Sequence, residues 1–414
     1  MPPEARAPLL PRPGGARPLV WLVLVALAAR LAAAFLLGGD TYRFADEAIY
    51  ADGAAQLVGG ESLAGPAAQV PGYVGFLALL GLLLPAGVLP LRLGQAAVLA
   101  LGVLPCHALG SRLGGPRAGV AAALVYALDP LVTVSASLLY PDAPAALLLA
   151  GALVLAWDAG RQGGMGTAAL AGIMLGALTT FRLVALALAP AMLAGVALMG
   201  QRPASRRARL AGSLIVGWLL VLGPWAAENL RTTGHLLPVA AALRSVPEIG
   251  ADAERVGVGE AVVGAAARNP AGFARRALRE FGHFWEPYPT RLATDQAMRR
   301  DELSREDPRL SAAPLAPRGV RDLVSAGSYT IEFLAALLGL WVCWRRRRLE
   351  TVWLLALVLS FAMGYAIFYG KLRYRIPVLP VVFVFTGVAA ARAAAHVGRR
   401  QPLAELPATA PSQQ

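Results

Sequence analysis

The sequence predicts an all-α, polytopic integral membrane protein. Of its 414 residues, 57% are hydrophobic and only 15% are charged, whereas a soluble domain has about 25% charged residues. The apolar residues gather in runs, each near the roughly 20 residues that a helix needs to cross a bilayer. We predict ten such spans, at 18–38, 91–110, 118–138, 143–157, 167–180, 183–199, 210–227, 328–344, 351–369 and 376–395.

The net charge of +13 comes from arginines that cluster at the ends of these runs. Cytoplasmic ends of membrane helices are enriched in arginine and lysine, so we interpret this charge as topology. Membrane lipids, and no nucleic acid, are the partners it predicts. Both cysteines, Cys106 and Cys343, fall inside or at the end of a span, which leaves no disulfide framework and no cysteine metal site.

The run 72–86 is apolar but short, and three prolines interrupt or flank it. If it does not cross the bilayer, the arginine-rich loops all lie on the cytoplasmic side with the N-terminus, as the positive-inside rule requires. We therefore predict a re-entrant or interfacial helix at 72–86. In the outer domain we predict a helix that extends to Phe284. The predicted parts of the chain are a cytoplasmic tail (1–17), an N-terminal membrane module (18–227) with a long first outer loop (40–90), a small outer domain (228–327), C-terminal membrane helices (328–395) and a disordered cytoplasmic tail (396–414).

The first outer loop carries an acidic cluster in the stretch "RFADEAIYADGAAQLVGG", residues 43–60. A helix that starts near Asp46 places Tyr50 one turn after it and can lie along the membrane surface. Asp46 and Glu47 then stand at the helix N-terminus, where carboxylates are favourable, so one interpretation is that they only cap this helix. The other interpretation depends on the motifs that follow them.

Five short motifs follow one another in the N-terminal half: the pair Asp46–Glu47, Pro-Gly-Tyr at 71–73, Arg-Leu-x-Gln at 92–95, Gly-Pro-Arg at 115–117 and Leu-Leu-x-x-Asp at 138–142. In this order they resemble the GT-C glycosyltransferases that use polyprenyl-phosphate sugars. The resemblance is closest to the branch that contains protein O-mannosyltransferases and the aminoarabinose transferases of lipid A. It resumes at "GPWAAENLRTTG" and "KLRYRIPVLPVV", although Glu228 stands where that family usually has arginine.

The resemblance implies a GT-C-like fold with a general base in the first outer loop, which falls on Asp46 with Glu47 beside it. It also implies an acidic residue at the next outer turn, which falls on Asp142, although a helix N-cap is the plainer interpretation of that residue. A base suits the reaction, because an acceptor hydroxyl must lose a proton as it attacks the anomeric carbon. We predict no cofactor and no metal site, since the four histidines lack metal-ligand spacing; a divalent cation is compatible with the sequence but not indicated by it.

Basic residues are under-represented at the outer ends of membrane helices, yet four remain there after the cytoplasmic arginines are set aside. They are Arg182, Lys371, Arg373 and Arg375. One interpretation is that they extend to lipid headgroups. The other, which the alternation of the last three with apolar and aromatic residues favours, is that they bind the donor phosphate. We add Tyr50 to these candidate substrate-binding residues.

The expected function is transfer of a sugar from a polyprenyl-phosphate donor to a lipid, glycan or protein acceptor, at the outer face of a bacterial inner membrane. The family implies inversion at the anomeric carbon. The sequence has no glycine-rich phosphate loop and no dinucleotide motif, which argues against a soluble nucleotide-sugar donor. Two alternatives stay open: a transporter or flippase for a lipid or polysaccharide, which an internal repeat would favour, and a non-catalytic assembly subunit with the same fold.

Overall fold

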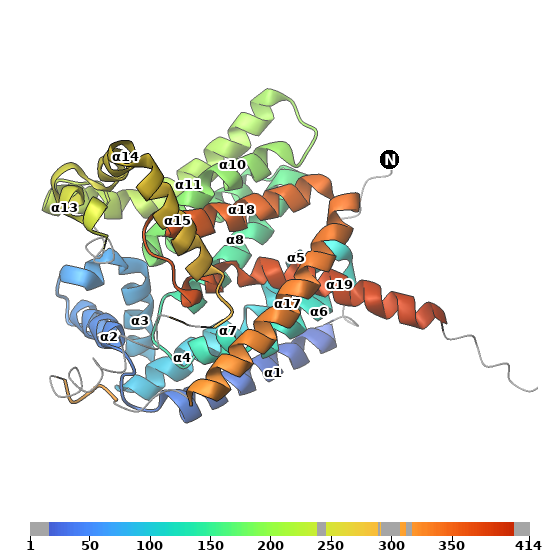
Figure 1. Ribbon diagram of the computed structural model, residues 1–414, viewed down its shortest axis with the longest axis horizontal. Helices are drawn as coiled ribbons and strands as arrows, with labels where there is room; N and C mark the ends of the chain where they lie inside the picture. Colours follow the sequence, from blue (N-terminus) through green and yellow to red (C-terminus); the bar gives the residue numbers. More distant parts are fainter. Residues whose placement is uncertain (1–15, 238–245, 289, 291–306, 312–316, 401–414) are drawn as a thin grey trace, which may run out of the picture.

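The fold is described from a computed structural model, which covers residues 16–237, 246–288, 290, 307–311 and 317–400. Every regular element within these ranges is a helix (Figure 1). Extended backbone pairs in one isolated parallel bridge there, between Tyr42 and Leu310. The predicted all-α class is confirmed.

The elements follow one another with short connections. The first half of the chain forms α1 (Ala16–Ala33), η2 (Ala34–Gly38), α2 (Ala45–Val58), η3 (Gly65–Gln69), α3 (Pro71–Leu83), α4 (Val88–Ala100), α5 (Val103–Gly114), α6 (Pro116–Leu128), α7 (Pro130–Ser135), α8 (Asp142–Gln162), α9 (Met165–Phe181), η4 (Leu183–Leu188) and α10 (Ala189–Leu198). The second half forms α11 (Ala204–Thr233), α13 (Pro247–Val256), α14 (Val258–Arg268), α15 (Pro270–Phe284), α17 (Arg318–Arg346), α18 (Arg348–Ile367), η5 (Leu372–Val378) and α19 (Leu379–Arg400).

In the part of the chain that the structure describes, seven helical segments are long and apolar enough to cross a membrane: Arg17–Gly38, Val88–Gly114, Asp142–Gln162, Ala204–Thr233, Gly319–Arg346, Arg348–Ile367 and Leu372–His396. The other three predicted spans coincide with shorter apolar helices, α6, α9 and the η4–α10 pair. The chain is therefore a multi-pass membrane protein, while the count of ten crossings stays a prediction. The run 72–86 forms α3, a helix of 13 residues, which is shorter than a bilayer requires.

The loop predicted to be the first outer one folds into a compact unit of α2, η3 and α3 around Tyr73, Val74 and Leu77, which are fully buried. Gly53 of α2 lies so close to η3 that a Cβ there would stand 2.8 Å from the Cβ of Ala67, so the approach requires glycine. This unit lies at one end of the helix bundle, at the left of Figure 1. It carries the acidic residues of the first loop to that end.

A helix break places Asp142 at the same end. The span predicted at 118–138 is interrupted at Asp129 and Pro130, where α6 ends and α7 begins. Asp129 caps α7, since its Oδ1 accepts a hydrogen bond from the N–H of Val132 at 2.6 Å, as expected of a local role. The chain then turns and starts α8 at Asp142. Helix α8 ends at Gln162, and the next residue, Gly163, has a φ of +81°, which suits glycine.

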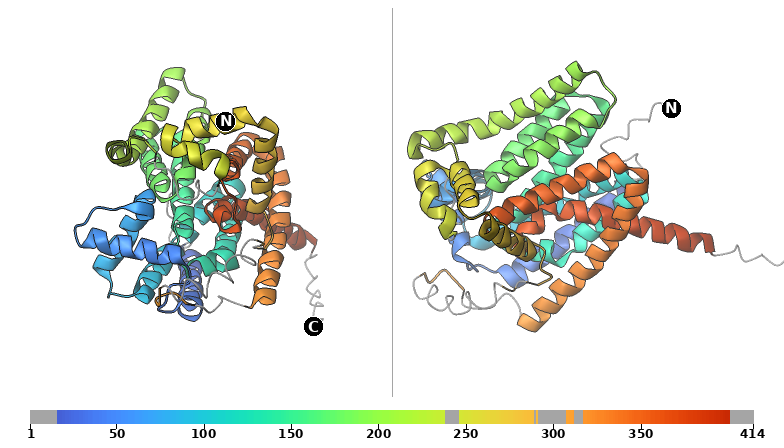
Figure 2. Two further views of the ribbon diagram at one scale, coloured as in Figure 1. Left: turned by 60° about the vertical axis from the view of Figure 1, so that its left-hand side comes forward. Right: turned by 45° about the horizontal axis from the view of Figure 1, so that its top comes forward.

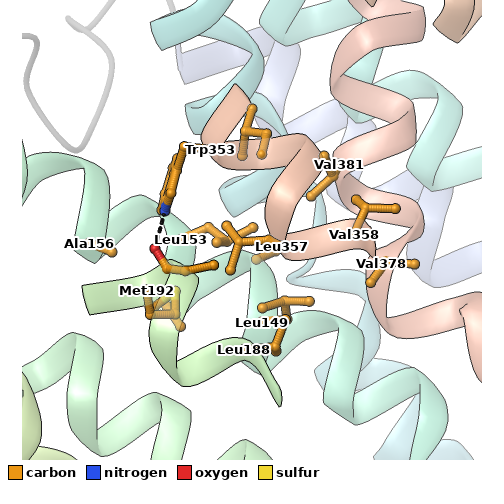
Figure 3. Close-up of a cluster of buried hydrophobic side chains, with 14 of the residues drawn as sticks. Leu149, Leu153, Ala156, Leu188, Met192, Trp353, Leu357, Val358, Val378 and Val381 are labelled. Carbon is orange, nitrogen blue, oxygen red and sulfur yellow. Dashed lines mark hydrogen bonds between the residues drawn. The ribbon is translucent and has the colours of Figure 1, made fainter. Parts of the chain in front are cut away.

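The main apolar core packs α18 and α10 against α8, as Figure 3 shows for Leu153, Met192 and Leu357. The indole of Trp353 reaches across this core and donates a hydrogen bond to the carbonyl of Ala191 at 2.8 Å. Because η5 follows α18 directly, this packing holds η5 beside α8, and thus beside Asp142.

Helices α13, α14 and α15 form a small layer of their own around Ile249, Ala253, Ala261 and Ala265 (Figure 2). Helix α15 ends at Phe284, as the sequence predicts, and packs on α18. Helix α11 continues beyond residue 227 and helix α17 starts before residue 328, the two positions where the sequence predicts the adjacent membrane spans to end and begin. The boundary and the side of the predicted outer domain stay predictions.

Candidate active site

Four charged side chains from four separate parts of the chain meet at the end of the bundle that carries α2. Asp46 is the second residue of α2 and Asp142 the first of α8, Arg182 lies between α9 and η4, and Arg373 belongs to η5. The Nη2 atom of Arg373 is 3.2 Å from Oδ2 of Asp46, and its Nε atom is 3.9 Å from Oδ2 of Asp142. The Nη2 atom of Arg182 is 2.5 Å from the same oxygen of Asp142. We call these four residues the outer charge cluster.

Asp142 is not a helix cap, so the plainer interpretation of this residue is wrong. Its side chain is 1% exposed, and α8 has Pro141 at the N-cap position without any side-chain cap. Neither carboxylate oxygen of Asp142 accepts a hydrogen bond from the described part of the chain. A buried carboxylate whose only partners are two arginines at ion-pair distance is costly to maintain, which indicates a functional role.

The two arginines of the outer charge cluster also have unused donors. In the residues the structure describes, the buried Nε and Nη2 atoms of Arg182 and the Nε atom of Arg373 make no hydrogen bond of good geometry. The Nη2 atom of Arg182 already faces Asp142 at 2.5 Å, whereas the two Nε atoms have no acceptor there at hydrogen-bond distance. A buried donor without an acceptor costs free energy, which an anionic oxygen from a ligand would recover. The cluster therefore has the charge and the free donors to bind a phosphate.

Tyrosine rings enclose this cluster. The guanidinium carbon of Arg373 lies 3.9 Å from the ring centre of Tyr140, and that of Arg182 lies 5.2 Å from the ring of Tyr374. Tyr374 stacks on Tyr365 with ring centres 4.4 Å apart. Cation–π contacts of this kind hold a guanidinium in place without using its N–H donors. The two arginines are thus oriented and still able to donate.

Tyr50 lies where the sequence places it, one helical turn after Asp46. Its ring contacts those of Tyr73 and Tyr140, with ring centres 5.4 and 6.4 Å apart. Burial, together with the nearby charge of Asp46, raises the pKa of the Tyr50 phenol to about 12. The phenol is therefore neutral at physiological pH and is available as a hydrogen-bond donor at the edge of the cluster.

Glu47 differs from Asp46 in every contact. Its Oε1 is 3.0 Å from Nη2 of Arg92, in an ion pair whose two side chains are both 0% exposed, and it also accepts the N–H of Leu139 at 2.7 Å. Its Oε2 accepts the N–H groups of Arg43 and Phe44, at 2.5 and 3.1 Å. Glu47 therefore caps α2 and ties the first outer loop to α4 and to the turn before α8.

Two of the four predicted cations, Lys371 and Arg375, form no ion pair with Asp46 or Asp142. Arg375 is buried on another side of η5, where its Nη1 donates to the carbonyl of Glu286 at 2.5 Å and its guanidinium covers the ring of Tyr329 at 4.1 Å. The ammonium of Lys371 lies 5.0 Å from the ring centre of Tyr369. Among the described residues, no group of three or more histidine, cysteine or acidic side chains has the arrangement of a metal site.

Sequence reasoning missed the tyrosines Tyr140 and Tyr374 and the framework role of Arg92. The signal for the tyrosines was present, because Tyr140 lies two residues before Asp142 and Tyr374 follows Arg373 directly. Arg92 also donates to the carbonyls of Gly39 and Thr41, at 2.6 and 2.9 Å. Nothing in the sequence pairs it with Glu47, which is 45 residues away along the chain.

Neither a scan against protein-family models nor a search of curated proteins finds a match for this chain. Among solved structures, the apo oligosaccharyltransferase of Archaeoglobus fulgidus is similar at 16% identity, with a TM-score of 0.58 over 93% of this chain and 51% of that one. ArnT from Cupriavidus metallidurans bound to undecaprenyl phosphate is also 16% identical, with a TM-score of 0.54 over 92% of this chain and 62% of that one. Archaeal AglB from A. fulgidus, in complex with an inhibitory peptide and a dolichol-phosphate, is 15% identical, with a TM-score of 0.55 over 94% and 51%.

The chain spans about half to three-fifths of the length of these structures. At such low identity the likeness establishes the fold alone. The suspected resemblance is confirmed at that level: the chain has the all-helical, multi-pass GT-C fold that the oligosaccharyltransferase and ArnT share.

Proposed function

We propose that the protein is a membrane glycosyltransferase that moves a sugar from a polyprenyl-phosphate donor to the hydroxyl of a lipid, glycan or protein acceptor. Two of the similar structures hold undecaprenyl phosphate and a dolichol-phosphate, as their descriptions state. The observation in this chain that carries the proposal is the outer charge cluster. It sets a half-exposed carboxylate, Asp46, against two arginines with unused buried donors.

In the proposed reaction, Arg182 and Arg373 bind the donor phosphate and Asp46 acts as general base. The oxygen of the acceptor hydroxyl forms a bond to the anomeric carbon, and Asp46 takes the proton that this hydroxyl loses. The bond between that carbon and the phosphate oxygen breaks, and its electron pair stays on the phosphate. The two guanidinium groups stabilise the negative charge that develops on the departing oxygen. The products are a glycoside of inverted configuration and polyprenyl phosphate.

Asp142 and Tyr50 complete the proposed site. Asp142 holds both arginines on one side, since its Oδ2 atom is 2.5 Å from Arg182 and 3.9 Å from Arg373. The neutral phenol of Tyr50 is a donor for the sugar or the phosphate. Glu47 positions Asp46 by fixing the first turn of α2. Arg375 anchors η5 through the carbonyl of Glu286 and the ring of Tyr329, and is not assigned to the phosphate. Lys371, directly before η5, stays a candidate contact to the phosphate.

We further propose that the cluster faces the outer side of a bacterial inner membrane. Impermeant thiol labelling of single exposed cysteines tests this. Ser62, after α2, and Ser205, at the start of α11, are exposed and serve as the two labelling sites. The native cysteines are buried and give little background. Labelling of Ser62→Cys alone in intact spheroplasts supports the outer orientation, and labelling of Ser205→Cys alone reverses it.

Two measurements test the function itself. Cells that lack the protein are expected to accumulate one lipid-linked sugar, which identifies the donor. The purified protein is then expected to convert that donor, with extracted acceptor, to polyprenyl phosphate and product. A transporter would move the lipid-linked sugar across proteoliposomes without consuming it. A non-catalytic subunit would neither convert the lipid-linked sugar nor transport it, although cells that lack it would also accumulate that sugar.

A further inference from the structure

A pocket of about 480 Å³ opens at the far end of the bundle from the outer charge cluster. Its walls are the turn between α5 and α6, the C-terminal end of α17 and the second half of α19. These elements lie together at the right of Figure 1, opposite α2 and α3. Helix α19 (Leu379–Arg400) starts after η5 at the cluster and reaches the pocket at Val388, so its first half separates the two sites.

Among the residues whose placement is described, four arginines and no acidic side chain line this pocket. They are Arg117 from the start of α6, Arg346 and Arg347 from the end of α17, and Arg392 from α19. The deeper wall is apolar, since Leu113 and Val388 are buried beneath the basic rim. The pocket thus combines a positive mouth with an apolar interior. We call it the basic pocket.

Other arginines at this end of the bundle are neutralised by acids. Arg112 forms an ion pair with Asp158 at 2.7 Å, and Arg161 contacts Glu350. Of the pocket arginines, only Arg347 has an acid within reach, at 3.8 Å from Glu350. The remaining three form no ion pair with any residue in the described ranges, and they converge on one space.

The backbone of the α5–α6 turn shapes the pocket. Gly114 lies against α19, where a Cβ would be 2.6 Å from Cγ2 of Val388. Gly115 has a φ of +90°, which lets the chain reverse and start α6 at Pro116. The positive end of the α6 dipole, on a helix of 13 residues, therefore adds to the arginine charges at the pocket mouth.

The face of α17 that leads away from the pocket is suited to lipid chains. Leu334, Leu337, Leu338 and Trp341 are exposed along it, and 11% of the apolar window of this helix is buried. Arg345 lies over the ring of Trp341 at 4.5 Å, so aromatic and basic groups meet at the level of the pocket, as they do at membrane interfaces. An acyl chain bound here has an apolar surface to follow.

We propose that the basic pocket binds the phosphate of an anionic phospholipid from the leaflet at this end of the protein. Basic pockets between membrane helices commonly receive phosphorylated lipid headgroups. The three arginines without acidic partners can bind the phosphodiester of the lipid headgroup and a second anionic or hydroxyl-bearing group on it. The apolar wall can pack against the first carbons of the acyl chains. The proposal is independent of the reaction at the other end. It also requires no particular orientation in the membrane.

Native mass spectrometry of the detergent-purified full chain, titrated with phosphatidylglycerol or phosphatidylcholine, tests the proposal. The pocket variant is Arg346→Gln/Arg392→Gln. Its matched control is Arg345→Gln/Arg348→Gln, which removes two charges from the same region, where both arginines cover tryptophan rings outside the pocket. All four arginines are exposed, so neither variant is expected to unfold.

Wild type is expected to bind phosphatidylglycerol at least tenfold more tightly than phosphatidylcholine. The pocket variant is expected to lose about thirtyfold in affinity for phosphatidylglycerol, since it removes two basic residues that each attract an anionic lipid. The control variant is expected to keep its affinity. Equal losses in the two variants, or equal binding of the two lipids, would overturn the proposal. Displacement of the lipid by equimolar inorganic phosphate would assign the pocket to a soluble anion and overturn the choice of a lipid.

Discussion

Asp46 and Glu47 are neighbours in the first turn of α2, yet they belong to two different ionic regions. The region around Glu47 is closed: carboxylate and arginine are both fully buried, and the carboxylate accepts three backbone N–H groups as well as Arg92. The region around Asp46 is open, since its side chain is 47% exposed and its contact is a single nitrogen of Arg373 at 3.2 Å.

The difference separates architecture from chemistry. The carboxylate of Glu47 has all its partners within the protein, and only Nε of Arg92 lacks one in the described part of the chain, so this buried pair acts through the geometry it fixes. A cluster with idle buried donors and a half-exposed carboxylate has capacity for a further ligand. Substitutions in the two regions should therefore affect different measurements, stability in the first and turnover in the second.

Glu47→Gln is expected to have the largest effect, and on stability. The amide removes the charge that compensates Arg92, and breaking a buried ion pair costs about 3–5 kcal/mol. The thermal unfolding midpoint in detergent should fall markedly. As a control, Glu228→Gln breaks the exposed pair with Arg231 and should leave the midpoint unchanged. An unshifted midpoint for Glu47→Gln would remove the distinction between the two regions.

Arg373→Gln is expected to weaken use of the donor by one to two decades in kcat/KM, because a charge-assisted contact to phosphate contributes about 1.5–3 kcal/mol. Folding should be retained, since the side chain sits at the open cluster. Arg375→Gln, two residues further on, is the matched comparison and should change stability more than donor use. The reverse result would return Arg375 to the phosphate site.

Arg182→Lys is expected to have the smallest effect. Lysine keeps the positive charge beside Asp142 but loses the planar group that lies over Tyr374. A loss of about tenfold or less in kcat/KM is expected, with little change in the thermal midpoint. If this variant is as impaired as a neutral substitution at the same position, then shape rather than charge governs the contact to the donor.

Much of the fold was predictable, because apolar runs and arginine-rich ends report membrane helices directly. Each predicted span lies on helical structure, although some, such as those at 91–110, 118–138 and 183–199, are divided between two helices, and the start of α2 and the end of α15 lie where the sequence places them. The resemblance pointed to Asp46 and Asp142, and the count of basic residues at outer helix ends pointed to Arg182, Lys371, Arg373 and Arg375. Sequence spacing alone does not bring together residues that are up to 327 positions apart.

The different directions of the Arg373 and Arg375 side chains were not predictable from the alternation of basic with apolar and aromatic residues in this segment. Two residues apart on an extended chain would share one face. The segment is instead a 3₁₀-helix, Leu372–Val378, in which each residue advances by a third of a turn. Arg375 is therefore directed to Glu286 and Tyr329. In the same way, the adjacency of Asp46 and Glu47 does not show that Glu47 faces the core of the loop and Asp46 faces the outer charge cluster.

The most direct test of the account compares turnover per folded molecule for Asp46→Asn and Asp52→Asn. Both remove a carboxylate from α2 at constant size, but Asp52 pairs with Arg309 at 2.7 Å outside the outer charge cluster. With the identified donor and acceptor, Asp46→Asn is predicted to lose two or more decades in kcat with an unchanged thermal midpoint, since an amide cannot accept the proton. Asp52→Asn is predicted to keep nearly full activity. Near-normal turnover of Asp46→Asn, or equal losses in the two variants, would contradict the assignment of the outer charge cluster as the reaction site.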